Sequence, residues 1–483
     1  MPASLSVDNG ASRPAAPLTV AVVGLGFSGT AVAIHLMRLL PEGARLLLVE
    51  PDARPGRGLA YGTRCASHWL NVPAGQLGWD PSHATGFIDW LQSRHGGYAP
   101  GDFVPRMLLG DYMAQALATG QQWARSRGVR VRRLCARAVG IDSPAGEPHV
   151  LRLDDGSAWP ADRIVLATGH LPPEQPTLAG GPRWGEPGLI HEPWGERALA
   201  ELPEDGEVLL LGSGLSAIDL LTWLQDRGHQ GRITLLSRRG LLPQPHRGLE
   251  ARPRAGLAAG PMLTAQPNLL SMLRQVRRWA DEARAEGQDW RDVMASLRPC
   301  TPKLWQQLSL RERRQFLRHL QPWWDTHRHR LAPGIHRRLQ AALCAGQVEL
   351  HAGRLDRVER LADGRLDVAW RARGSATLQH RRVAAVVNCT GPAARVGRAA
   401  PGSLLASLQA QGRLRVDPLG LGLHVDPAHG LLDTAGCSQT GLYYVGPLLK
   451  AQHWEAIAIP ELRVHARDVA REVASTLVLP ATA

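Results

Sequence analysis

LLLGSGLSAIDLL, at residues 209–221, has the same pattern as VAVVGLGFSGTAVAIHL at residues 20–36. In both stretches an apolar run typical of a buried strand leads into a glycine-rich turn, and a helical pattern follows. The first glycine permits a tight turn and the second lets the backbone approach a pyrophosphate. A small third residue lets the helix pack closely on the strand. The two stretches therefore predict two dinucleotide-binding units in one chain.

The first unit contains every part that such a site requires. After its helix, ARLLLVEP (44–51) forms a second apolar strand that ends in Glu50. A carboxylate at this strand end accepts hydrogen bonds from the hydroxyls of an adenosine ribose, and the amides at the helix N-terminus hold the phosphates. The predicted cofactor-binding residues of this unit are Gly24, Gly26, Phe27, Ser28, Gly29 and Glu50.

The second unit differs in the charge at the matching strand end. Glu50 lies 21 positions after Gly29, and Arg238 lies 21 positions after Ala217. A carboxylate repels a 2′-phosphate, whereas a guanidinium binds one bidentately. The first unit therefore suits FAD or NAD and the second suits NADPH, unless the arginines are only solvated charges. The residues predicted to bind the second dinucleotide are Gly212, Gly214, Leu215, Ser216, Arg238 and Arg239.

Two further apolar runs end in a Thr-Gly pair. They are ADRIVLATGHLPP (161–173) and VAAVVNCTGP (383–392). Such small turns let backbone approach a bound cofactor, although a plain turn explains each one singly. Because each run follows a fingerprint unit, we expect both to be strands by which the chain re-enters the first domain. Thr168, Gly169, Thr390 and Gly391 are therefore further predicted cofactor contacts.

The bulk composition fits a globular, multidomain protein of 483 residues. The net charge of +13 comes almost wholly from scattered arginines, since only Lys303 and Lys450 are lysines, and we predict no nucleic-acid partner. No apolar run is long enough to span a membrane and the N-terminus has no secretory pattern, so we predict no membrane partner.

The six cysteines, at positions 65, 135, 300, 344, 389 and 437, contain no Cys-x-x-Cys pair. A zinc knuckle and a redox dithiol both need such close spacing, and disulfide reductases pass their electrons through a dithiol. The sequence therefore argues against a disulfide reductase, and it favours a reduced, cytoplasmic setting.

Residues 267–345 predict a helical insert, because apolar residues recur at steps of three and four. Its tail, WWDTHRHRLAP (323–333), contains His327 and His329. Positions two apart on a helix point to nearly opposite sides, so we predict no metal site there. We expect these residues either to stabilise the insert or to offer positive charge to an anionic substrate or to the NADPH phosphates.

Taken together, several motifs resemble those of bacterial FAD/NAD(P)-binding oxidoreductases. This group is similar to two-dinucleotide flavoproteins such as flavin monooxygenases and amino-acid N-hydroxylases. The linker departs from the flavin monooxygenases, because GLIHEPW (188–194) echoes their aromatic, Gly and His residues at other spacings. The motifs that carry the resemblance are GLGFSG (24–29), GRGLAYG (56–62), LNVPAG (70–75), VPRMLLGDYM (104–113), LATGHLPP (166–173), LGSGLSAIDLL (211–221), SRRGLLPQPH (237–246), FLRHLQPWWDTHRHRLAP (316–333), NCTGP (388–392) and YVGPLLKAQHWEAIAIPELR (444–463).

The resemblance implies an α/β fold of glutathione-reductase-like plan, with two Rossmann-like domains, a helical insert, FAD and NADPH. Asn71 would lie beside the flavin or substrate, unless it only caps a turn, and Trp454 and Glu455 would lie near the flavin end of the last helix, unless they only pack. These three residues are the candidates for catalysis. The predicted domains are 18–170 for the first part of the FAD domain, 171–206 for a linker, 207–266 for the NAD(P)H domain, 267–345 for the insert, and 346–483 for the return to the FAD domain.

Three functions follow from these expectations. The first is an FAD-dependent NAD(P)H enzyme that oxidises N or S of a small molecule with O2. The second is a reductase or dehydrogenase that does not activate O2. The third is a non-catalytic FAD-binding protein with a protein partner. The oligomeric state is left open.

Overall fold

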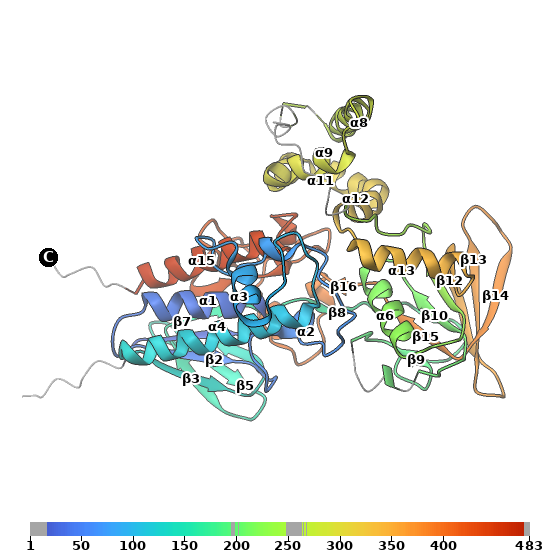
Figure 1. Cartoon of the computed structure of the whole chain (residues 1–483). Helices are drawn as coiled ribbons and strands as arrows, with labels where there is room; N and C mark the ends of the chain where they lie inside the picture. The colour runs from blue at the N-terminus through green and yellow to red at the C-terminus, as the bar shows by residue number, and fades with distance from the viewer. Residues whose placement is uncertain are drawn as a thin grey trace, which may run out of the picture.

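The computed structural model of the chain describes residues 17–194, 199–200, 202–247, 263, 265–266 and 268–477. Two sheet-based domains lie side by side, and a cluster of helices rises above the junction between them (Figure 1). This arrangement is the predicted α/β plan with two dinucleotide-binding units and a helical insert.

The first domain is built on a six-stranded sheet in the order β17-β18-β7-β1-β2-β3. All neighbours are parallel except β17, which pairs antiparallel with β18. A crossover through α1 connects the parallel strands β1 and β2, as the first fingerprint predicts. The strands and helices are β1 (Thr19–Val23), α1 (Phe27–Leu39), β2 (Arg45–Val49), α4 (Arg106–Ser126), β3 (Arg130–Leu134), β7 (Arg163–Leu166), β17 (Gly430–Leu432), β18 (Ser438–Tyr444) and α15 (Ile459–Ser475).

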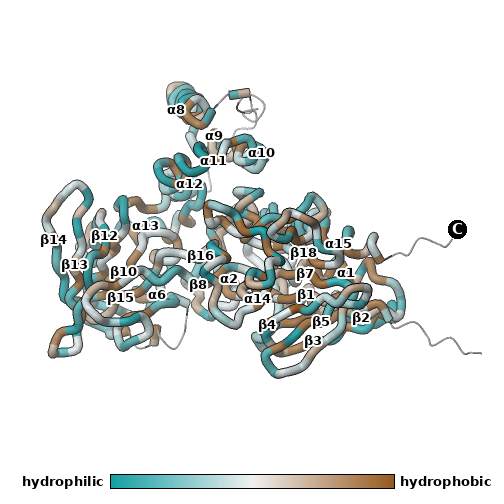
Figure 2. Tube along the Cα trace, turned by 180° about the vertical axis from the view of Figure 1, so that it is seen from behind, coloured by the Kyte–Doolittle hydropathy of each residue, from teal (hydrophilic) through white to brown (hydrophobic). Residues whose placement is uncertain are grey.

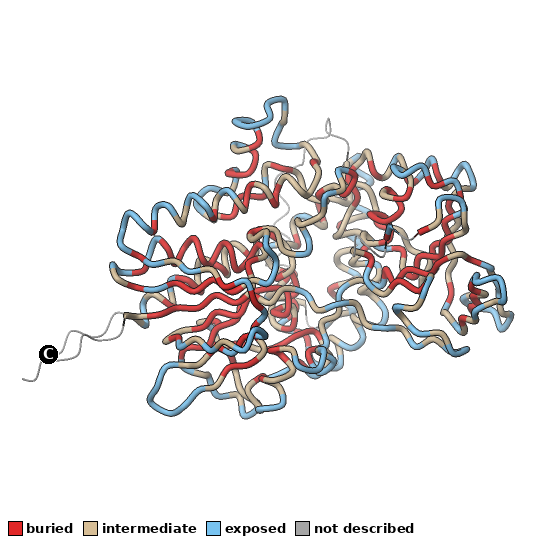
Figure 3. The backbone as a smooth tube through the Cα atoms, turned by 90° about the horizontal axis from the view of Figure 1, so that it is seen from below, coloured by how far each residue is buried: buried red, intermediate tan, exposed pale blue. Residues whose placement is uncertain are grey.

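Both faces of this sheet are covered, which explains why its strands are continuous apolar runs. Val20 and Val22 pack with α1, α4 and α15 on one face. Ala21 and Val23 point the other way, onto a small antiparallel sheet and α14 (Leu404–Ala410). Figure 2 shows hydrophobic residues along these strands, and Figure 3 shows the same strands buried. The small sheet consists of β4 (Ala138–Asp142), β5 (His149–Leu153) and β6 (Ala158–Ala161).

The second domain has a seven-stranded sheet in the order β14-β13-β12-β11-β10-β15-β9. Its centre repeats the first domain, because α6 connects the parallel neighbours β10 and β11. The helices α6 and α13 cover one face, and the antiparallel strands β12 to β14 contribute to the core on the other. The elements are β9 (Leu189–Ile190), β10 (Val208–Leu211), α6 (Leu215–Asp226), β11 (Ile233–Ser237), α13 (Pro333–Cys344), β12 (Val348–Arg360), β13 (Leu366–Ala372), β14 (Leu378–Val383) and β15 (Ala385–Asn388).

This sheet corrects three expectations about the domain boundaries. The predicted return to the first domain at residue 346 is wrong, because β12 to β15 all belong to the second sheet. The strand within 383–392 does not re-enter the first domain, since β15 pairs with β10. The predicted linker 171–206 includes β9, which pairs with β15. An apolar run does not reveal which sheet it joins, since that depends on partners far away in the sequence.

The chain crosses between the domains on a short two-stranded ribbon. Here β8 (Leu171–Pro173) leads into the second domain and β16 (Pro392–Ala393) leads back, and the two strands pair antiparallel. The chain therefore leaves and re-enters the first domain at one place.

The helical insert has its own apolar core. Trp279 and Trp305 are buried there together with Trp454, which precedes α15 of the first domain. The ring centroids of Trp305 and Trp454 lie 4.5 Å apart, so this contact fastens the insert to the first domain. The last helix of the predicted insert, α13, packs on the second sheet instead. The remaining helices are α8 (Leu269–Ala285), α9 (Trp290–Leu297), α10 (Thr301–Gln307), α11 (Leu310–Gln315), the π-helical turn η3 (Phe316–Leu320) and α12 (Gln321–Arg328).

Candidate functional site

The glycine turn of the first unit is closed by close backbone contacts. Gly24 has a φ of +93°, and a Cβ there would lie 2.3 Å from the carbonyl oxygen of Ala167. A Cβ on Gly29 would lie 1.8 Å from the carbonyl oxygen of Gly24. No other residue fits either position without moving the backbone.

The second unit reproduces this contact. Gly212 has a φ of +124°, and a Cβ there would lie 2.3 Å from the carbonyl oxygen of Cys389. Ala167 precedes Thr168 and Gly169, as Cys389 precedes Thr390 and Gly391. Each Thr-Gly pair therefore lies beside the fingerprint turn of its own domain, one pair for each unit.

The ends of the two central helices can accept phosphate groups. The N-caps of α1 and α6 are Gly26 and Gly214, and neither helix has a side-chain cap. A Cβ on Gly214 would meet nothing within 4 Å. Phe27 and Ser28 begin α1, and Leu215 and Ser216 begin α6. The amides without a side-chain cap and the helix dipole at each end thus fit a dinucleotide pyrophosphate.

Glu50 lies against the first turn, as its spacing predicts. Its carboxylate accepts a hydrogen bond from the backbone amide of Leu25, with an Oε2–N distance of 2.7 Å. The carboxylate therefore lies directly beside the first glycine turn.

Arg238 and Arg239 follow β11, but their surroundings differ. Arg239 donates a hydrogen bond from Nη2 to the backbone oxygen of Arg318 in η3, at 2.5 Å. Arg238 is exposed and has no polar partner among the described residues. Of the two, Arg238 has the free guanidinium that a 2′-phosphate needs, while Arg239 ties the second domain to the insert.

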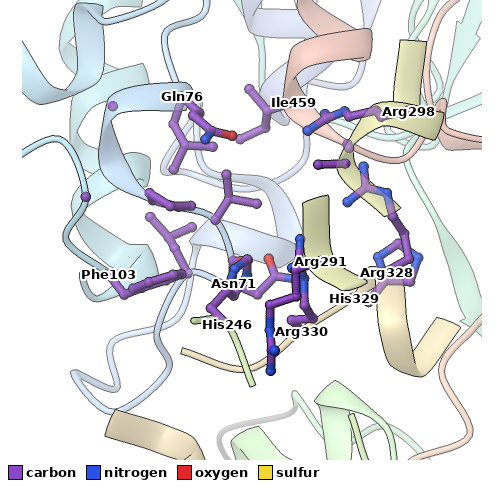
Figure 4. Close-up of a pocket in the computed structure, with 18 of the residues that line it drawn as sticks. Asn71, Gln76, Phe103, His246, Arg291, Arg298, Arg328, His329, Arg330 and Ile459 are labelled. Carbon is purple, nitrogen blue, oxygen red and sulfur yellow. The ribbon is translucent and has the colours of Figure 1, made fainter. Parts of the chain in front are cut away.

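A cavity of about 590 Å³ lies where the two domains and the insert meet. Its volume is in the range of small-molecule sites. One wall comes from the first domain, with Tyr61, the segment 70–77 and Phe103, and the opposite wall comes from the insert. Figure 4 shows Phe103 on one side of the cavity and Arg298 and Arg328 on the other. The N-terminal end of α15 reaches the cavity at Ile459.

Asn71 is the one predicted catalytic candidate that lines this cavity. Its backbone oxygen pairs with Nε2 of His246, at 2.9 Å, which links the first domain to the loop after β11. Burial lowers the pKa of His246 to about 4, with help from the nearby Arg330, so its imidazole is neutral at pH 7.

Trp454 and Glu455 lie behind the cavity, in the contact between the insert and the first domain. Trp454 is part of the apolar core of the insert. Glu455 is 1% exposed and pairs with Arg328 through both oxygens, at 2.8 and 3.2 Å. In this position Glu455 orients Arg328, which does line the cavity.

The two histidines of the insert tail do different things. His327 bonds the backbone oxygen of Trp323 at 2.8 Å and packs against Trp290. His329 lines the cavity, and burial together with Arg328 lowers the pKa of His329 to about 3. No cluster of three or more metal-ligating side chains occurs in the described parts of the chain.

Sequence reasoning did not find most of the arginines around the cavity. They lie on segments that are far apart in the chain, and their only signal was the Arg-rich tail of the insert. The cavity lining includes Arg247, Arg291, Arg298, Arg328 and Arg330.

An ion pair joins the two domains. Arg106 Nη2 of α4 lies 2.6 Å from Asp219 Oδ2 of α6, and both side chains are largely buried. Arg106 also stacks over the ring of Trp194 and donates a hydrogen bond to the backbone oxygen of Trp69. Burial raises the pKa of Asp219 to about 6, against the opposing charge of Arg106.

Each glycine turn and the helix end that follows it, at residues 24–29 and 212–217, form a cradle for a dinucleotide. The two cradles, one for each domain, define a flavoprotein fold with two dinucleotide-binding domains. Residues 21–171 match the FAD-NAD(P)-binding family, so the first domain is an FAD-NAD(P)-binding domain. Among solved structures, the chain resembles ornithine hydroxylase from Pseudomonas aeruginosa, with 16% identity, a TM-score of 0.59 and coverage of 95% of this chain and 100% of that one. L-lysine 6-monooxygenase from Pseudomonas syringae gives 16% identity, a TM-score of 0.61 and coverage of 95% and 99%.

Other relatives are more varied. Thioredoxin reductase from Lactococcus lactis has 13% identity and a TM-score of 0.50, with coverage of 95% and 99%. A curated protein, the tRNA 5-methylaminomethyl-2-thiouridine biosynthesis bifunctional protein MnmC of Chromohalobacter salexigens, is 30% identical. The match covers 34% of this chain and only 30% of that protein. No helix in the described part of the chain is long and apolar enough to cross a membrane.

Proposed function

We propose that this protein is an FAD-dependent NAD(P)H oxidoreductase that uses O2 to oxidise a nitrogen or sulfur atom of a small molecule. The observation that carries the proposal is the matched pair of cradles with Glu50 at one strand end and Arg238 at the other. A carboxylate suits the free ribose of FAD and a guanidinium suits NADPH. The likeness of the whole chain to ornithine and lysine hydroxylases supports the oxygenase form of the reaction.

When bound, FAD supplies the redox chemistry, by accepting hydride from NADPH and giving electrons to O2. In the balanced reaction, NADPH, a proton, O2 and the substrate yield NADP⁺, water and the oxygenated substrate. The chain's own contribution is to hold the reactants together. The glycine turns and the helix ends of α1 and α6 bind the phosphates, the insert covers the cavity, and Asn71 lies at the cavity wall to orient a bound group.

The first test uses the purified protein and its visible spectrum. We expect a yellow protein whose flavin absorbance is bleached by NADPH without oxygen and returns on exposure to air, with O2 consumed. A colourless protein that does not take up FAD, or a flavin that NADPH does not bleach, would contradict the proposal. The latter result would favour a non-catalytic FAD-binding protein.

A second outcome separates the oxygenase from a reductase. The alternative is a reductase that transfers electrons to an organic acceptor in the same cavity, and the likeness in fold to thioredoxin reductase supports keeping it as the second candidate. If NADPH oxidation consumes no O2 and accelerates with a quinone, the reductase replaces the oxygenase. We expect either enzyme to work in the cytoplasm, because its cysteines form no Cys-x-x-Cys framework.

Arg238 is expected to determine the choice of coenzyme. In the Arg238→Asp variant, KM for NADPH should rise by about tenfold to a hundredfold, since a charge-assisted hydrogen bond is replaced by repulsion. KM for NADH should change little. Steady-state rates with both coenzymes measure this. Arg227→Asp is the matched control, because Arg227 is an exposed arginine at the far end of α6. Equal losses for NADPH and NADH would show that Arg238 does not bind the phosphate.

A further inference from the structure

The cavity between the domains has an arginine-rich wall. Five arginines contribute to its lining, whereas Asp292 is the only carboxylate among the described residues that line it. The arginines come from the loop after β11, from α9 and the residue that follows it, and from the end of α12 and the segment after it. They are Arg247, Arg291, Arg298, Arg328 and Arg330.

Four of these arginines are balanced by carboxylates of the protein. Arg247 lies 2.5 Å from Asp292, and Arg291 lies 3.1 Å from Asp289. Arg298 forms two hydrogen bonds to the carboxylate of Glu461. Arg328 forms two to the carboxylate of Glu455. In each case an internal negative charge compensates the guanidinium, so these four arginines support the wall without needing a ligand.

Arg330 is different. It forms no ion pair with the described residues, and its Nε is buried there without a hydrogen-bond partner. Its charged neighbours are three arginines, Arg328, Arg291 and Arg247, and one carboxylate, Asp289. Burial and the three arginines outweigh Asp289 and lower the pKa of Arg330 to about 10. The side chain still carries a full positive charge at pH 7. Arg330 is partly buried, and a charge withdrawn from water is costly unless it is paired. An anion from outside the chain would supply the missing partner.

The wall facing the arginines is suited to a carbon skeleton. Leu70 and Val72 come from the first domain, Phe103 lies on the far side, and Ile459 closes the N-terminal end of α15 (Figure 4). A ligand with an apolar body and a charged end would satisfy both walls at once.

We propose that the cavity binds a small molecule that carries an oxyanion, a carboxylate or a phosphate, with the oxyanion on the guanidinium of Arg330 and the apolar part against Val72 and Phe103. The planar donor fork of arginine matches both kinds of oxyanion. The inference that an oxyanion binds here rests on the cavity alone. Its assignment to the substrate rests on the proposed function.

The experiment is calorimetric titration of the oxidised, FAD-loaded protein at constant ionic strength. The probes are benzoate, phenyl phosphate and the neutral analogue benzamide, which share one ring. We expect benzoate or phenyl phosphate to bind saturably and benzamide to bind at least tenfold more weakly. The anion that binds more tightly identifies the group of the natural ligand. Equal binding of benzamide would overturn the proposal.

Three variants locate the binding to Arg330. Arg330→Gln should weaken anion binding at least tenfold, and Arg330→Lys, which keeps the charge but loses the fork, should weaken it less. Arg284→Gln removes an exposed arginine of α8 in the same insert and should bind as the original protein does. Unchanged binding by Arg330→Gln, with FAD content intact, would overturn the proposal. An Arg330→Gln variant that raises KM for NADPH but leaves benzoate binding unaltered would likewise overturn it.

Because the titration needs no NADPH, its failure is distinct from failure of the proposed function. A protein that binds benzoate through Arg330 but is not reduced by NADPH would refute the oxidoreductase and leave the anion site standing. A protein that is reduced by NADPH but ignores both anions would refute the anion site alone.

Discussion

The Gly212→Ala variant should purify with FAD bound and should be reduced by NADPH about a hundredfold more slowly than the original protein. The new methyl group would lie 2.3 Å from the carbonyl oxygen of Cys389, at a φ of +124°, so the turn must move. A displaced turn no longer aims the amides of α6 at the pyrophosphate, whereas the first domain is untouched. Anaerobic rapid-mixing measurements of flavin bleaching would give the rate, and dithionite would show that the flavin itself remains reducible.

The companion variant, Gly24→Ala, should show the opposite defect. Its methyl group would lie 2.3 Å from the carbonyl oxygen of Ala167, so the protein should purify colourless. Gly228→Ala is the control, since Gly228 also has a positive φ, at the other end of α6, but has open space around it. Normal reduction of Gly212→Ala by NADPH, or loss of FAD in that variant, would contradict the assignment of the two cradles.

Replacing Arg106 by Leu should lower the free energy of unfolding by about 3 to 5 kcal/mol at about pH 9, because an ionised Asp219 would then be buried without its partner. Chemical denaturation of the FAD-loaded protein measures this. The double variant Arg106→Leu/Asp219→Leu should recover most of the loss, since apolar residues often replace a buried pair at little cost. A double variant that is as unstable as the single one would show that the pair itself is not the cause.

The pH dependence of the same variants gives an independent check. Asp219 has a raised pKa in the folded protein, about 6, against about 3.9 in an unfolded chain. Its ionisation therefore costs stability as the pH rises through this window, and removing Arg106 enlarges that cost. The penalty of Arg106→Leu should be small below about pH 6, where Asp219 is protonated with or without Arg106, and should grow by up to about 1.4 kcal/mol per pH unit above it. The double variant should lack this dependence.

The sequence was sufficient for the fold class and for the two nucleotide cradles. Strand, glycine turn, helix and strand are adjacent in the chain, so their geometry is local, and the turns at Gly24 and Gly212 form as their spacing predicts. The FAD-NAD(P)-binding family of residues 21–171 agrees with the first of them. Whether Arg238 selects NADPH stays a prediction.

The parts that depend on distant contacts could not be predicted. The apolar strand β15 was placed in the wrong sheet, because nothing in its residues distinguishes β10 from β7 as a partner. The cavity wall draws on residues from 61 to 459, and only folding brings them together. Trp454 and Arg328 illustrate the difficulty, since a tryptophan and an arginine give the same local pattern whether they line a cavity or stand behind it.

The paired crossing strands β8 and β16 have a consequence for how such a molecule could arise. Pro173 and Pro392 are partners in the ribbon, so everything between them starts and finishes at neighbouring points. A chain joined directly from one proline to the other would preserve the order of strands in the first sheet. The second domain, with the helices above it, is thus an insertion at a single point of the first domain, and its exchange as a unit would require new partners only for contact residues such as Trp454 and Arg106.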